Sequence, residues 1–513
     1  MKHWRNLVKF AFQRVTLVSI SLLLQILLLA YGVIAASTAY RVVSVLIGVL
    51  SWIVILYILS VSRAGQAYKL AWVIPILCLP VLGVLLYLLF GGKQVSRASK
   101  KRTHEDARIL SGELRQDPEV LEALKAQAPE AEMSVRYLKE AALYPVWQDS
   151  PTRYYSPADA AEADLFAALE SAERYIFLEY FIISPGLIWD RVLEILERKA
   201  AAGVQVRLLY DDFGCIKHLP MRYAKQLAEK GIRAYAVNPY IPVLSSRLNN
   251  RDHRKLLIVD GKTAFTGGVN LSDEYFYKVP TFGHWKDSML RVQGQAAWAM
   301  CVEFLIHWRS VAKEECSFNR FRPDLSQSPA AKGFVQPYAD TPLDEEQVGE
   351  NVYLNVIRAA RRTLDIQTPY LVIDEALTIA LCAAARSGVR VRIFTPGIPD
   401  KWYVFALTRA YYGQLTEAGV QIYEYTPGFL HSKVFLADEK LAVVGTINLD
   451  FRSLYLHYED AVLLAETDSV DQVAQDFQSL KKRCARFSEE RIRSIKPPMR
   501  LLQAVLRVFA PLM

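Results

Sequence analysis

The sequence predicts an α/β protein whose soluble part is internally duplicated and is preceded by an α-helical membrane region. Three observations lead to this prediction. The first ninety residues hold long apolar stretches without charges, the following residues alternate strand-like and helix-like patterns, and the same order of patterns then recurs. Strands that alternate with helices favour a layered α/β fold. A repeat this long indicates two copies of a domain rather than a solenoid.

Three apolar stretches near the N-terminus are each long enough to cross a bilayer as a helix, which takes roughly 20 residues. They cover Val15–Ala36, Val42–Val61 and Ala71–Phe90. The first is too long for the core of a signal peptide, and a second stretch follows almost at once, so an uncleaved anchor is the better interpretation. We therefore expect membrane-embedded helical segments over residues 1–92.

The orientation of this region follows from its basic residues, which gather in the cytoplasm in membrane proteins. Pro75 and Pro80 interrupt the third stretch, because proline removes a backbone donor and kinks a helix. The sequence thus predicts two full crossings plus one irregular segment, in the cell (inner) membrane, with the catalytic part cytoplasmic. Basic clusters stand before the first stretch and after the third: Lys2, Arg5, Lys9 and Arg14, then Lys93, Arg97, Lys100, Lys101 and Arg102.

The rest of the chain divides into a charged linker with a short helix (93–149), a first half (150–330), a second half (331–490) and a C-terminal helix (491–513). Met499–Phe509 would form a basic amphipathic helix, suited either to an anionic bilayer or to docking on the core. In each half the expected order is strand, helix, strand. These elements are Tyr175–Ile182, Trp189–Ala201 and Val204–Tyr210, then Thr363–Tyr370, Ala376–Arg386 and Gly388–Phe394.

Composition narrows the class of partner. The net charge of +8 favours an anionic partner, namely nucleic acid, an acidic membrane surface or a phosphorylated substrate. Basic residues that only flank membrane segments would give the same balance. The six cysteines form no C-x-x-C pair and are scattered, so neither a zinc site nor a disulfide framework is indicated.

The duplication is clearest in two short motifs. His253-Arg-Lys255 leads to Asp260, Gly267 and Asn270, and His431-Ser-Lys433 leads to Asp438, Gly445 and Asn448 at identical spacing. One copy of such a pattern is weak evidence. Two copies in register are very improbable by chance, so we interpret them as one bipartite catalytic site.

The spacing explains the chemistry of these motifs. The residues after each histidine are apolar and β-prone, and alternate residues of a strand share a face, so each His projects beside its Lys. A lysine next to an imidazole suits a phosphate better than a metal. The histidine is then a nucleophile or a proton carrier.

The motifs contain further polar residues whose roles the sequence leaves open. Asp260 and Asp438 end the two strands and would either orient an imidazole or hold a turn. Asn270 and Asn448 offer neutral donors to a phosphate or to a catalytic side chain.

Paired motifs of this form resemble the phospholipase D superfamily, and the surrounding residues are similar to bacterial cardiolipin synthases more narrowly. The similarity covers nearly the whole chain, although the first apolar stretch is additional to the two found in some relatives. The similar segments are Asn249–Lys255, Gly267–Tyr275, Trp285–Asp287, Thr368–Tyr370, Tyr423–His431, Gly445–Tyr458 and the apolar Ala71–Gly91.

The resemblance implies two tandem phospholipase D-like α/β/α domains, related by a pseudo-two-fold axis that brings both motifs into one site. It implies phosphatidylglycerol as both donor and acceptor, cardiolipin and glycerol as products, and no metal or cofactor. We expect His253 to be the nucleophile and His431 the acid/base, with near-symmetry making the reverse almost as good. Asp287 and Glu459 stand at matching places, either positioning the histidines or lying in solvated loops.

Other functions share these motifs. Water or another alcohol as acceptor would make the protein a hydrolase or a different transferase, and an inactive membrane scaffold is a further alternative. A nuclease is disfavoured, because the apolar segments place the site near lipid and no aromatic stacking platform accompanies the basic residues. We expect phosphatidylglycerol and an anionic bilayer as partners and no nucleic acid, and we leave self-association open.

Overall fold

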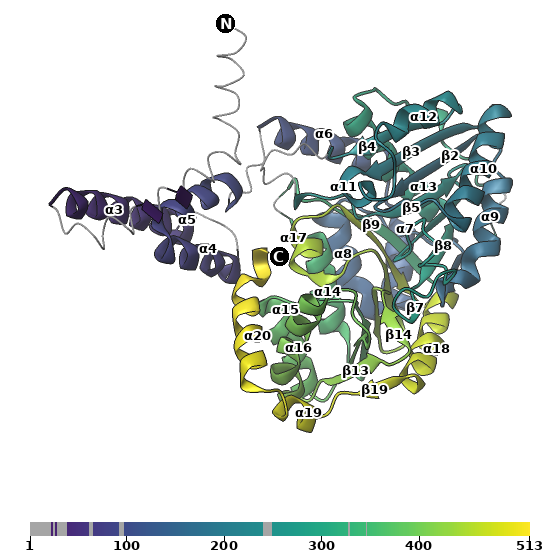
Figure 1. Cartoon of the computed structure of the whole chain (residues 1–513). Helices are drawn as coiled ribbons and strands as arrows, with labels where there is room; N and C mark the ends of the chain where they lie inside the picture. The colour runs from purple at the N-terminus through teal and green to yellow at the C-terminus, as the bar shows by residue number, and fades with distance from the viewer. Residues whose placement is uncertain are drawn as a thin grey trace, which may run out of the picture. The chain divides into compact units, whose positions relative to one another are not determined.

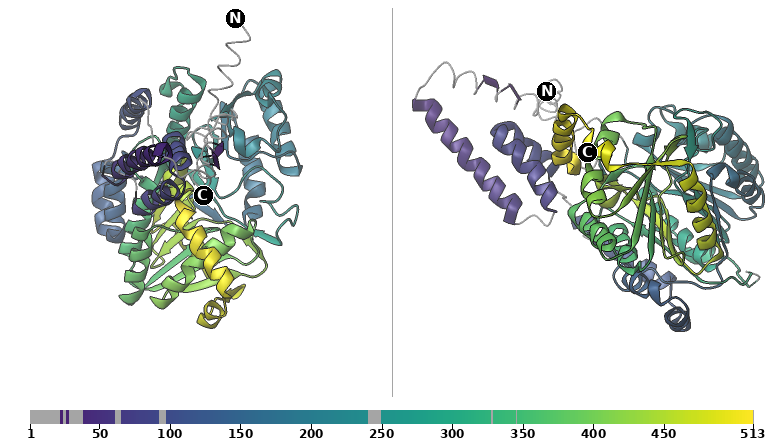
Figure 2. Two further views of the ribbon diagram at one scale, coloured as in Figure 1. Left: turned by 60° about the vertical axis from the view of Figure 1, so that its left-hand side comes forward. Right: turned by 90° about the horizontal axis from the view of Figure 1, so that it is seen from below.

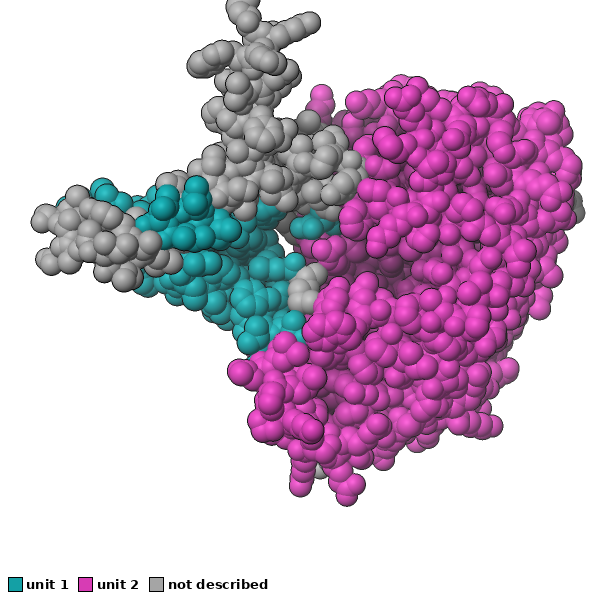
Figure 3. Space-filling view, in the orientation of Figure 1, with its two compact units in different colours: residues 1–95, 240–250, 504–513 teal, residues 96–239, 251–503 magenta. Residues whose placement is uncertain are grey.

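The computed structural model describes residues 22–23, 26–27, 38–60, 65–91, 97–239, 249–326, 329–344 and 346–512. The chain forms two compact units, which Figure 3 colours separately. Unit 1 comprises residues 1–95, 240–250 and 504–513, and unit 2 comprises residues 96–239 and 251–503. The expected first membrane stretch, Val15–Ala36, lies almost entirely outside the described residues.

In unit 1, α3 (Thr38–Ser60) contains one segment, Val42–Ser60, that is long and apolar enough to cross a membrane. The expected third stretch is broken into α4 (Gln66–Cys78), α5 (Pro80–Leu86) and the π-helical turn η1 (Tyr87–Gly91). The break falls at Leu79, beside Pro80, whereas Pro75 lies inside α4. Gly83 packs directly on the backbone of Ile76, where a side chain would not fit, so α5 folds back against α4.

The first half of unit 2 is built on a seven-stranded mixed sheet, and its helices lie beside it in Figure 1. Strands β2, β3 and β4 run parallel and the remaining neighbours antiparallel. In spatial order the strands are β1 (Thr152–Tyr155), β8 (Met289–Gln293), β6 (Thr263–Gly267), β5 (Lys255–Val259), β2 (Tyr175–Tyr180), β3 (Gln205–Asp211) and β4 (Arg233–Val237).

The second half repeats this sheet with one additional strand, β19, at its edge. In spatial order its strands are β19 (Cys484–Arg486), β13 (Gln421–Tyr425), β12 (Arg390–Pro396), β10 (Thr363–Gln367), β15 (Val434–Ala437), β16 (Leu441–Gly445), β18 (Glu459–Ala465) and β9 (Phe334–Asp340). Strand for strand, β10, β12, β15 and β16 take the places of β2, β3, β5 and β6. The predicted duplication of an α/β unit is therefore confirmed.

Helices connect and cover the strands, as the two views of Figure 2 show. The central strands β2 and β10 are buried along nearly their whole length, and β2 is accordingly apolar apart from Glu179, whereas β10 also carries Asp365 and Gln367. The helices of the first half are α9 (Glu162–Glu170), α10 (Leu187–Ala201), α11 (Asp212–Cys215), α12 (Tyr223–Glu229) and α13 (Gln295–Ala312). Those of the second are α14 (Val348–Ala359), α15 (Glu375–Arg386), α16 (Trp402–Glu417), α17 (Phe451–Tyr455), α18 (Asp468–Lys482) and α19 (Glu489–Arg493).

Two segments outside the sheets are more ordered than the sequence suggested. Residues 93–149, expected as a linker with a short helix, form α6 (Arg97–Glu113), α7 (Pro118–Gln127) and α8 (Glu132–Glu140), where Leu124 and Leu138 are buried. The C-terminal helix, α20 (Pro497–Phe509), buries Gln503, whose side-chain amide donates to the Ala406 carbonyl of α16. Leu501 and Val505 of α20 are exposed.

Two short strand pairs complete unit 2. One joins β11 (Leu371–Val372) to β17 (Leu449–Asp450) inside the second half. The other joins β7 (His284–Lys286) of the first half to β14 (Gly428–Leu430) of the second. This second pair links the halves directly and leads into the second motif.

Candidate active site

The first motif lies in the middle of the first sheet, at the C-terminal end of the parallel strand β2. Lys255 opens β5 and pairs with Tyr180, the last residue of β2. His253 comes just before the strand, and its backbone N–H donates to the carbonyl of Tyr458 in the second half at 2.9 Å. The Lys255 Nζ donates to the His253 carbonyl at 2.5 Å. Both side chains are almost wholly buried.

The second motif is held in the same way with the halves exchanged. The strand β14 ends one residue before His431, whose backbone N–H donates to the Lys286 carbonyl of the first half at 2.7 Å. The Lys433 ammonium donates to the carbonyl of His431 and lies 2.9 Å from its Nδ1 atom. The segment before each histidine thus pairs with a segment of the other half.

This exchange gives each imidazole a carboxylate from the opposite half. His253 Nδ1 lies 3.0 and 2.9 Å from the two carboxylate oxygens of Glu459, and His431 Nδ1 lies 2.7 Å from Asp287 Oδ2. Each carboxylate is the residue after the one that pairs with the histidine backbone. A carboxylate that accepts from Nδ1–H fixes the tautomer and leaves Nε2 as the reactive nitrogen.

Asp260 and Asp438 are occupied elsewhere. Asp260 accepts three backbone N–H groups, those of residues 173–175, at 2.7–2.8 Å. Asp438 accepts the equivalent three, those of residues 361–363, at 2.7–2.8 Å. Both residues have positive φ angles at the turns that end β5 and β15. Of the two roles that the sequence left open, this geometry favours the turn.

Strand geometry explains the placement of these two aspartates. Seven residues separate His253 from Asp260, and a strand rises about 3.3 Å per residue, so the two lie roughly 20 Å apart along β5. The aspartate therefore lies at the opposite end of the strand from the histidine. There it ties the start of β2 to the end of β5.

Burial and mutual repulsion set the charges of the site. Burial is the main reason that the pKa of Lys255 falls to about 8 and that of Lys433 to about 7. Burial and the Lys433 charge lower the pKa of His431 to about 4, against the opposing effect of Asp287. Burial also lowers the pKa of His253 well below its usual value, helped by the charges of Lys255, Lys433 and His431. Both imidazoles are therefore neutral near pH 7.

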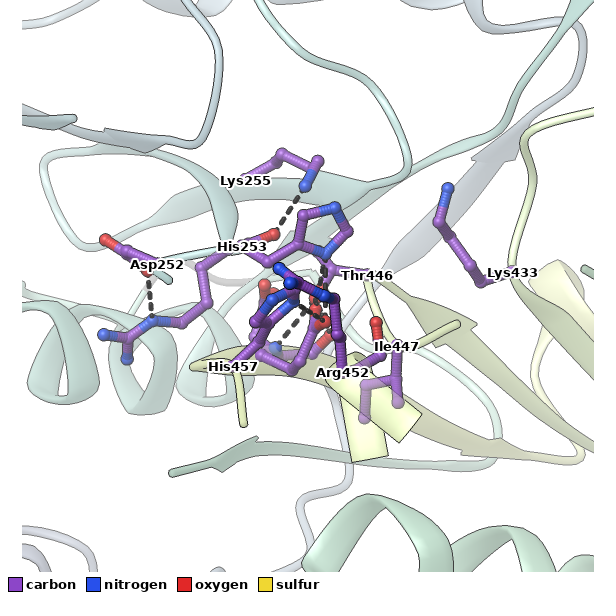
Figure 4. Close-up of polar contacts among 12 residues, drawn as sticks. Asp252, His253, Lys255, Lys433, Thr446, Ile447, Arg452 and His457 are labelled. Atoms are coloured by element: carbon purple, nitrogen blue, oxygen red, sulfur yellow. Dashed lines mark hydrogen bonds and ion pairs between the residues drawn. The ribbon is translucent and has the colours of Figure 1, made fainter. Parts of the chain in front are cut away.

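These interactions also show that the two motifs share one electrostatic site. Lys433 and His431 of the second half act on His253 of the first, and Lys255 acts on His431 in return. Figure 4 shows Lys433 near His253 and Lys255. Two lysines and two neutral imidazoles form a group of side chains suited to one phosphodiester, which carries a single negative charge.

The two asparagines are buried beside the motifs. Asn270 Oδ1 accepts from the backbone N–H of Ile182 at 3.0 Å, which leaves its amide nitrogen as the donor. Asn448 Oδ1 meets no hydrogen-bond partner among the described residues. Asn448 therefore has an unsatisfied group in a site that sequence reasoning assigned to phosphate.

Small residues beside each carboxylate were not predicted. A side chain at Gly268 would place its Cβ 2.0 Å from Asp287 Oδ1, so only glycine leaves room for this carboxylate. At the equivalent place in the second half, the hydroxyl of Thr446 donates to Glu459. The motif spacing contains this signal, since residues 267–268 and 445–446 occupy matching positions.

Aromatic rings close the site around both imidazoles, and sequence reasoning did not single them out. Tyr275 and Trp285 lie 5.4 and 5.3 Å from the His431 ring between centroids. Phe181 lies 5.1 Å from the His253 ring, and His457 lies 5.6 Å from it. Tyr275, Trp285 and His457 lie inside the segments that are similar to the family, and this similarity is the sequence feature that could have identified them.

Two groups of described residues bring potential metal-ligand atoms within 4.8 Å of one another. In the first, Lys255 and Lys433 repel a cation from His253. In the second, the Arg254 guanidinium already lies 2.7 Å from Glu179. These fixed positive charges disfavour a divalent ion, so the absence of a metal stays our expectation. The groups are His253, His457 and Glu459, and Glu179, Asp252 and His307.

Taken together, a duplicated α/β sheet and two His–Lys pairs with exchanged carboxylates define the phospholipase D class of proteins. A family model described as "Cardiolipin synthase, PLD-like domain" matches residues 165–293 and 353–481. A second model, "Phospholipase_D-nuclease N-terminal", matches residues 49–92. The chain belongs to the cardiolipin synthase family of phospholipase D-like proteins, as the sequence resemblance implied.

Individual relatives agree with this assignment. A cardiolipin synthase of Geobacillus kaustophilus is 34% identical over 90% of this chain and 92% of its own length. An uncharacterized protein of Streptococcus mutans is 38% identical over 90% of this chain and 99% of its own length. A phosphatidylserine synthase of Haemophilus influenzae shares the fold, with a TM-score of 0.54 and 12% identity over 74% of this chain and 97% of that one.

The family assignment confirms two earlier expectations. The protein is a phosphatidyltransferase of the phospholipase D superfamily, with phospholipids as its substrates. The N-terminal family match and the apolar helix α3 also identify it as a membrane protein.

Proposed function

We propose that the protein joins two molecules of phosphatidylglycerol into cardiolipin and releases glycerol. The observation that carries this proposal is the exchange of carboxylates, His253 with Glu459 and His431 with Asp287, which builds one two-histidine site from both halves. The named relatives are cardiolipin synthases that this chain covers over 85–92% of their length.

In the first step His253 Nε2 attacks the phosphorus of one phosphatidylglycerol, and the bond from phosphorus to the glycerol oxygen breaks. His431 gives a proton to the departing glycerol, and a phosphatidyl-histidine remains. Lys255 and Lys433 neutralise the phosphate oxygens, and Asn270 and Asn448 donate further hydrogen bonds. These roles are part of the proposal.

In the second step the hydroxyl of another phosphatidylglycerol gives its proton back to His431, and its oxygen attacks phosphorus. The P–N bond to His253 breaks and cardiolipin is released. We give His431 the proton-transfer role because its partner Asp287 acts against the effect of burial and raises its pKa, which suits a group that carries a proton. The bound phosphate raises this pKa further and makes protonation feasible at neutral pH.

Residues Asp260 and Asp438 support this site from the far edge of each sheet. Their six backbone hydrogen bonds fix the turns after β5 and β15, and so the register of the strands that begin at Lys255 and Val434. We therefore propose a structural role for both.

We also propose that the protein is a multi-pass protein of the cell membrane with a cytoplasmic catalytic part. An α-helix of 13 residues, the length of α4, spans about 20 Å, less than the roughly 30 Å of a bilayer core. The broken α4–α5 segment then enters the membrane without crossing it. Membrane-impermeant labelling of cysteines introduced at residues 62 and 93 tests this, since our topology places both on the cytoplasmic side, whereas a full crossing by α4–α5 would place them on opposite sides.

The function is tested by incubating the purified protein with phosphatidylglycerol alone, without added metal. We expect cardiolipin and glycerol in equal amounts, and no product from His431→Ala. Phosphatidic acid in place of cardiolipin would identify a hydrolase. Absence of turnover in both proteins would identify an inactive scaffold.

A further inference from the structure

Exposed apolar side chains gather in unit 2 where chain segments follow the strands that lead to the site. Phe213, Ile216 and Met221 follow β3, Tyr277 follows the first motif, and Ile398 and Trp402 follow β12. We call these six residues the apolar rim. Met221 is 91% exposed and Trp402 is 66% exposed, which are high values for such large apolar side chains. The strands β3 and β12 are equivalent, so both halves contribute.

In the first half the rim reaches the site through one residue. The Arg251 guanidinium lies 5.2 Å from the Phe213 ring, and Arg251 stands two residues before His253. A second contact links this segment to the first motif. Gly214, next to Phe213, packs on the carbonyl of Phe181, and the Phe181 ring contacts the ring of His253. Phe213 therefore lies at the border of the first motif.

In the second half the rim reaches His431 by a comparable route. Asp400, two residues before Trp402, accepts a hydrogen bond from the Tyr370 hydroxyl at 2.6 Å. Tyr370 packs against Phe429, which packs against His431, with ring centroids 6.4 and 5.7 Å apart. Trp402 therefore borders the second motif.

The two groups of rim residues also meet each other. The Tyr277 ring lies 4.7 Å from that of His284, and next to it Gly283 leaves room for the Ile398 side chain, which would lie 3.2 Å from a Cβ there. Tyr277 of the first half and Ile398 of the second half thus flank the same segment, Gly283–His284.

The substrate chemistry explains why such a surface would be useful. His253 and His431 are each only 7% exposed, so the phosphate has to enter the protein to react. Withdrawing a whole diacyl lipid into water would expose its acyl chains and is strongly unfavourable. The reaction is feasible when the site meets the phosphate at the depth where it lies in the bilayer.

We propose that the apolar rim inserts into the interfacial zone of the phospholipid bilayer and places the two histidines at the level of the lipid phosphates. The composition of the rim fits this zone, where Trp and Tyr are enriched, and Lys217 and Lys401 beside it suit anionic headgroups. This inference rests on the proposed function, because it takes a membrane phospholipid as the substrate. A second copy of the chain covering the rim is the alternative occupant.

The test compares two presentations of the same headgroup, using the full chain. Activity is measured on phosphatidylglycerol in bilayers and on a short-chain phosphatidylglycerol dispersed below its micelle concentration. The double variant Met221→Glu, Trp402→Glu should lower the ratio of bilayer to dispersed activity at least tenfold. Met133→Glu, an exposed methionine of α8 away from the strand ends, should leave this ratio within about twofold of the parent value.

A ratio equal to that of the parent protein in the double variant would overturn the inference. Failure of the parent protein on both substrates would instead contradict the proposed function. If the double variant loses activity on both substrates, a fluorescence measurement tests whether the rim inserts into the bilayer. Brominated lipids should quench the tryptophan fluorescence of the parent protein more than that of Trp402→Phe. Equal quenching, or a dimer that Trp402→Glu dissociates, would overturn insertion of the rim.

Discussion

Four carboxylates accompany the two motifs, three of them buried and Asp438 partly buried, and their positions separate two roles. Asp287 and Glu459 accept from imidazole nitrogens, whereas Asp260 and Asp438 accept from backbone N–H groups. The two sets stand at opposite edges of their sheets. A substitution that keeps the shape but removes the charge should therefore act differently in each set.

Asp287→Asn should lower kcat by about 10³- to 10⁴-fold, because an amide stabilises the wrong imidazole tautomer and no longer supports the imidazolium. Asp260→Asn should lower the free energy of unfolding by about 1–3 kcal/mol, since one of its backbone donors loses an acceptor. Steady-state kinetics and denaturant unfolding of both variants check this. A larger loss of kcat in Asp260→Asn would contradict our assignment of roles.

The lysines make the reaction sensitive to pH. Their lowered pKa values, about 7 for Lys433 and about 8 for Lys255, mean that each is charged below that value and loses its proton as the pH rises through it. We expect kcat/KM to fall as the pH rises from 7 to 9. The bound phosphate raises both pKa values, so kcat should fall at higher pH than kcat/KM does.

The control for this prediction is Lys433→Arg, whose guanidinium stays charged throughout this range. Its maximal rate should be lower because the geometry changes, but the fall of kcat/KM should begin at higher pH. A flat profile of kcat/KM between pH 6 and 9 in the parent protein would contradict the account.

At this scale the sequence identified the motif residues and named Asp287 and Glu459 as possible partners of the histidines, but not which histidine each one contacts. His253, Lys255, His431 and Lys433 were recognisable because their spacing repeats. The carboxylate partner of each histidine lies more than 140 residues away in the other half, and only strand pairing between the halves brings them together. Spacing along the sequence favours Asp260 as the partner of His253, but the length of β5 places Asp260 at the other end of the strand, away from the histidine.

At the scale of elements, short strands between the halves position the catalytic groups. The pair β7–β14 and the bridge between Asp252 and Tyr458 set the backbone of each histidine one residue from the carboxylate it needs. The long strands and helices were predictable from their hydrophobic periodicity. β7 and β14, each three residues long, have too few residues to show any period.

Gly268 tests the packing of one such element. Gly268→Ala should push the Asp287 carboxylate away from His431 and lower kcat at least tenfold, because the new Cβ would lie 2.0 Å from Oδ1. Gly112→Ala in α6 is the matched control, since nothing lies within 4 Å of a Cβ there. That control should retain activity and gain about 0.5–1 kcal/mol of helix stability. Full activity of Gly268→Ala would show that the close packing is dispensable.

At the scale of the whole molecule, duplication explains why the site is nearly but not fully symmetric. Two copies of one sheet supply equivalent His–Lys pairs, and divergence gives one imidazole an aspartate and the other a glutamate with Thr446. The number of copies and the strand–helix–strand order along each copy were predictable, because sequence patterns repeat. The helical structure of residues 97–140 was not, because its charged composition concealed a few buried leucines.

The central claim is that both imidazoles serve the reaction at one phosphorus atom, which His253 attacks while His431 transfers the proton. The most direct measurement is mass spectrometry of protein quenched with denaturant at mildly alkaline pH, where the P–N bond survives, after brief reaction with phosphatidylglycerol, in the parent protein and in His253→Asn and His431→Asn. We predict a phosphatidyl adduct on His253 alone, absent in His253→Asn and formed much more slowly in His431→Asn, because that variant lacks the group that protonates the departing glycerol. An adduct on His431 would reverse the two roles, and no adduct in any of the three proteins would contradict the account.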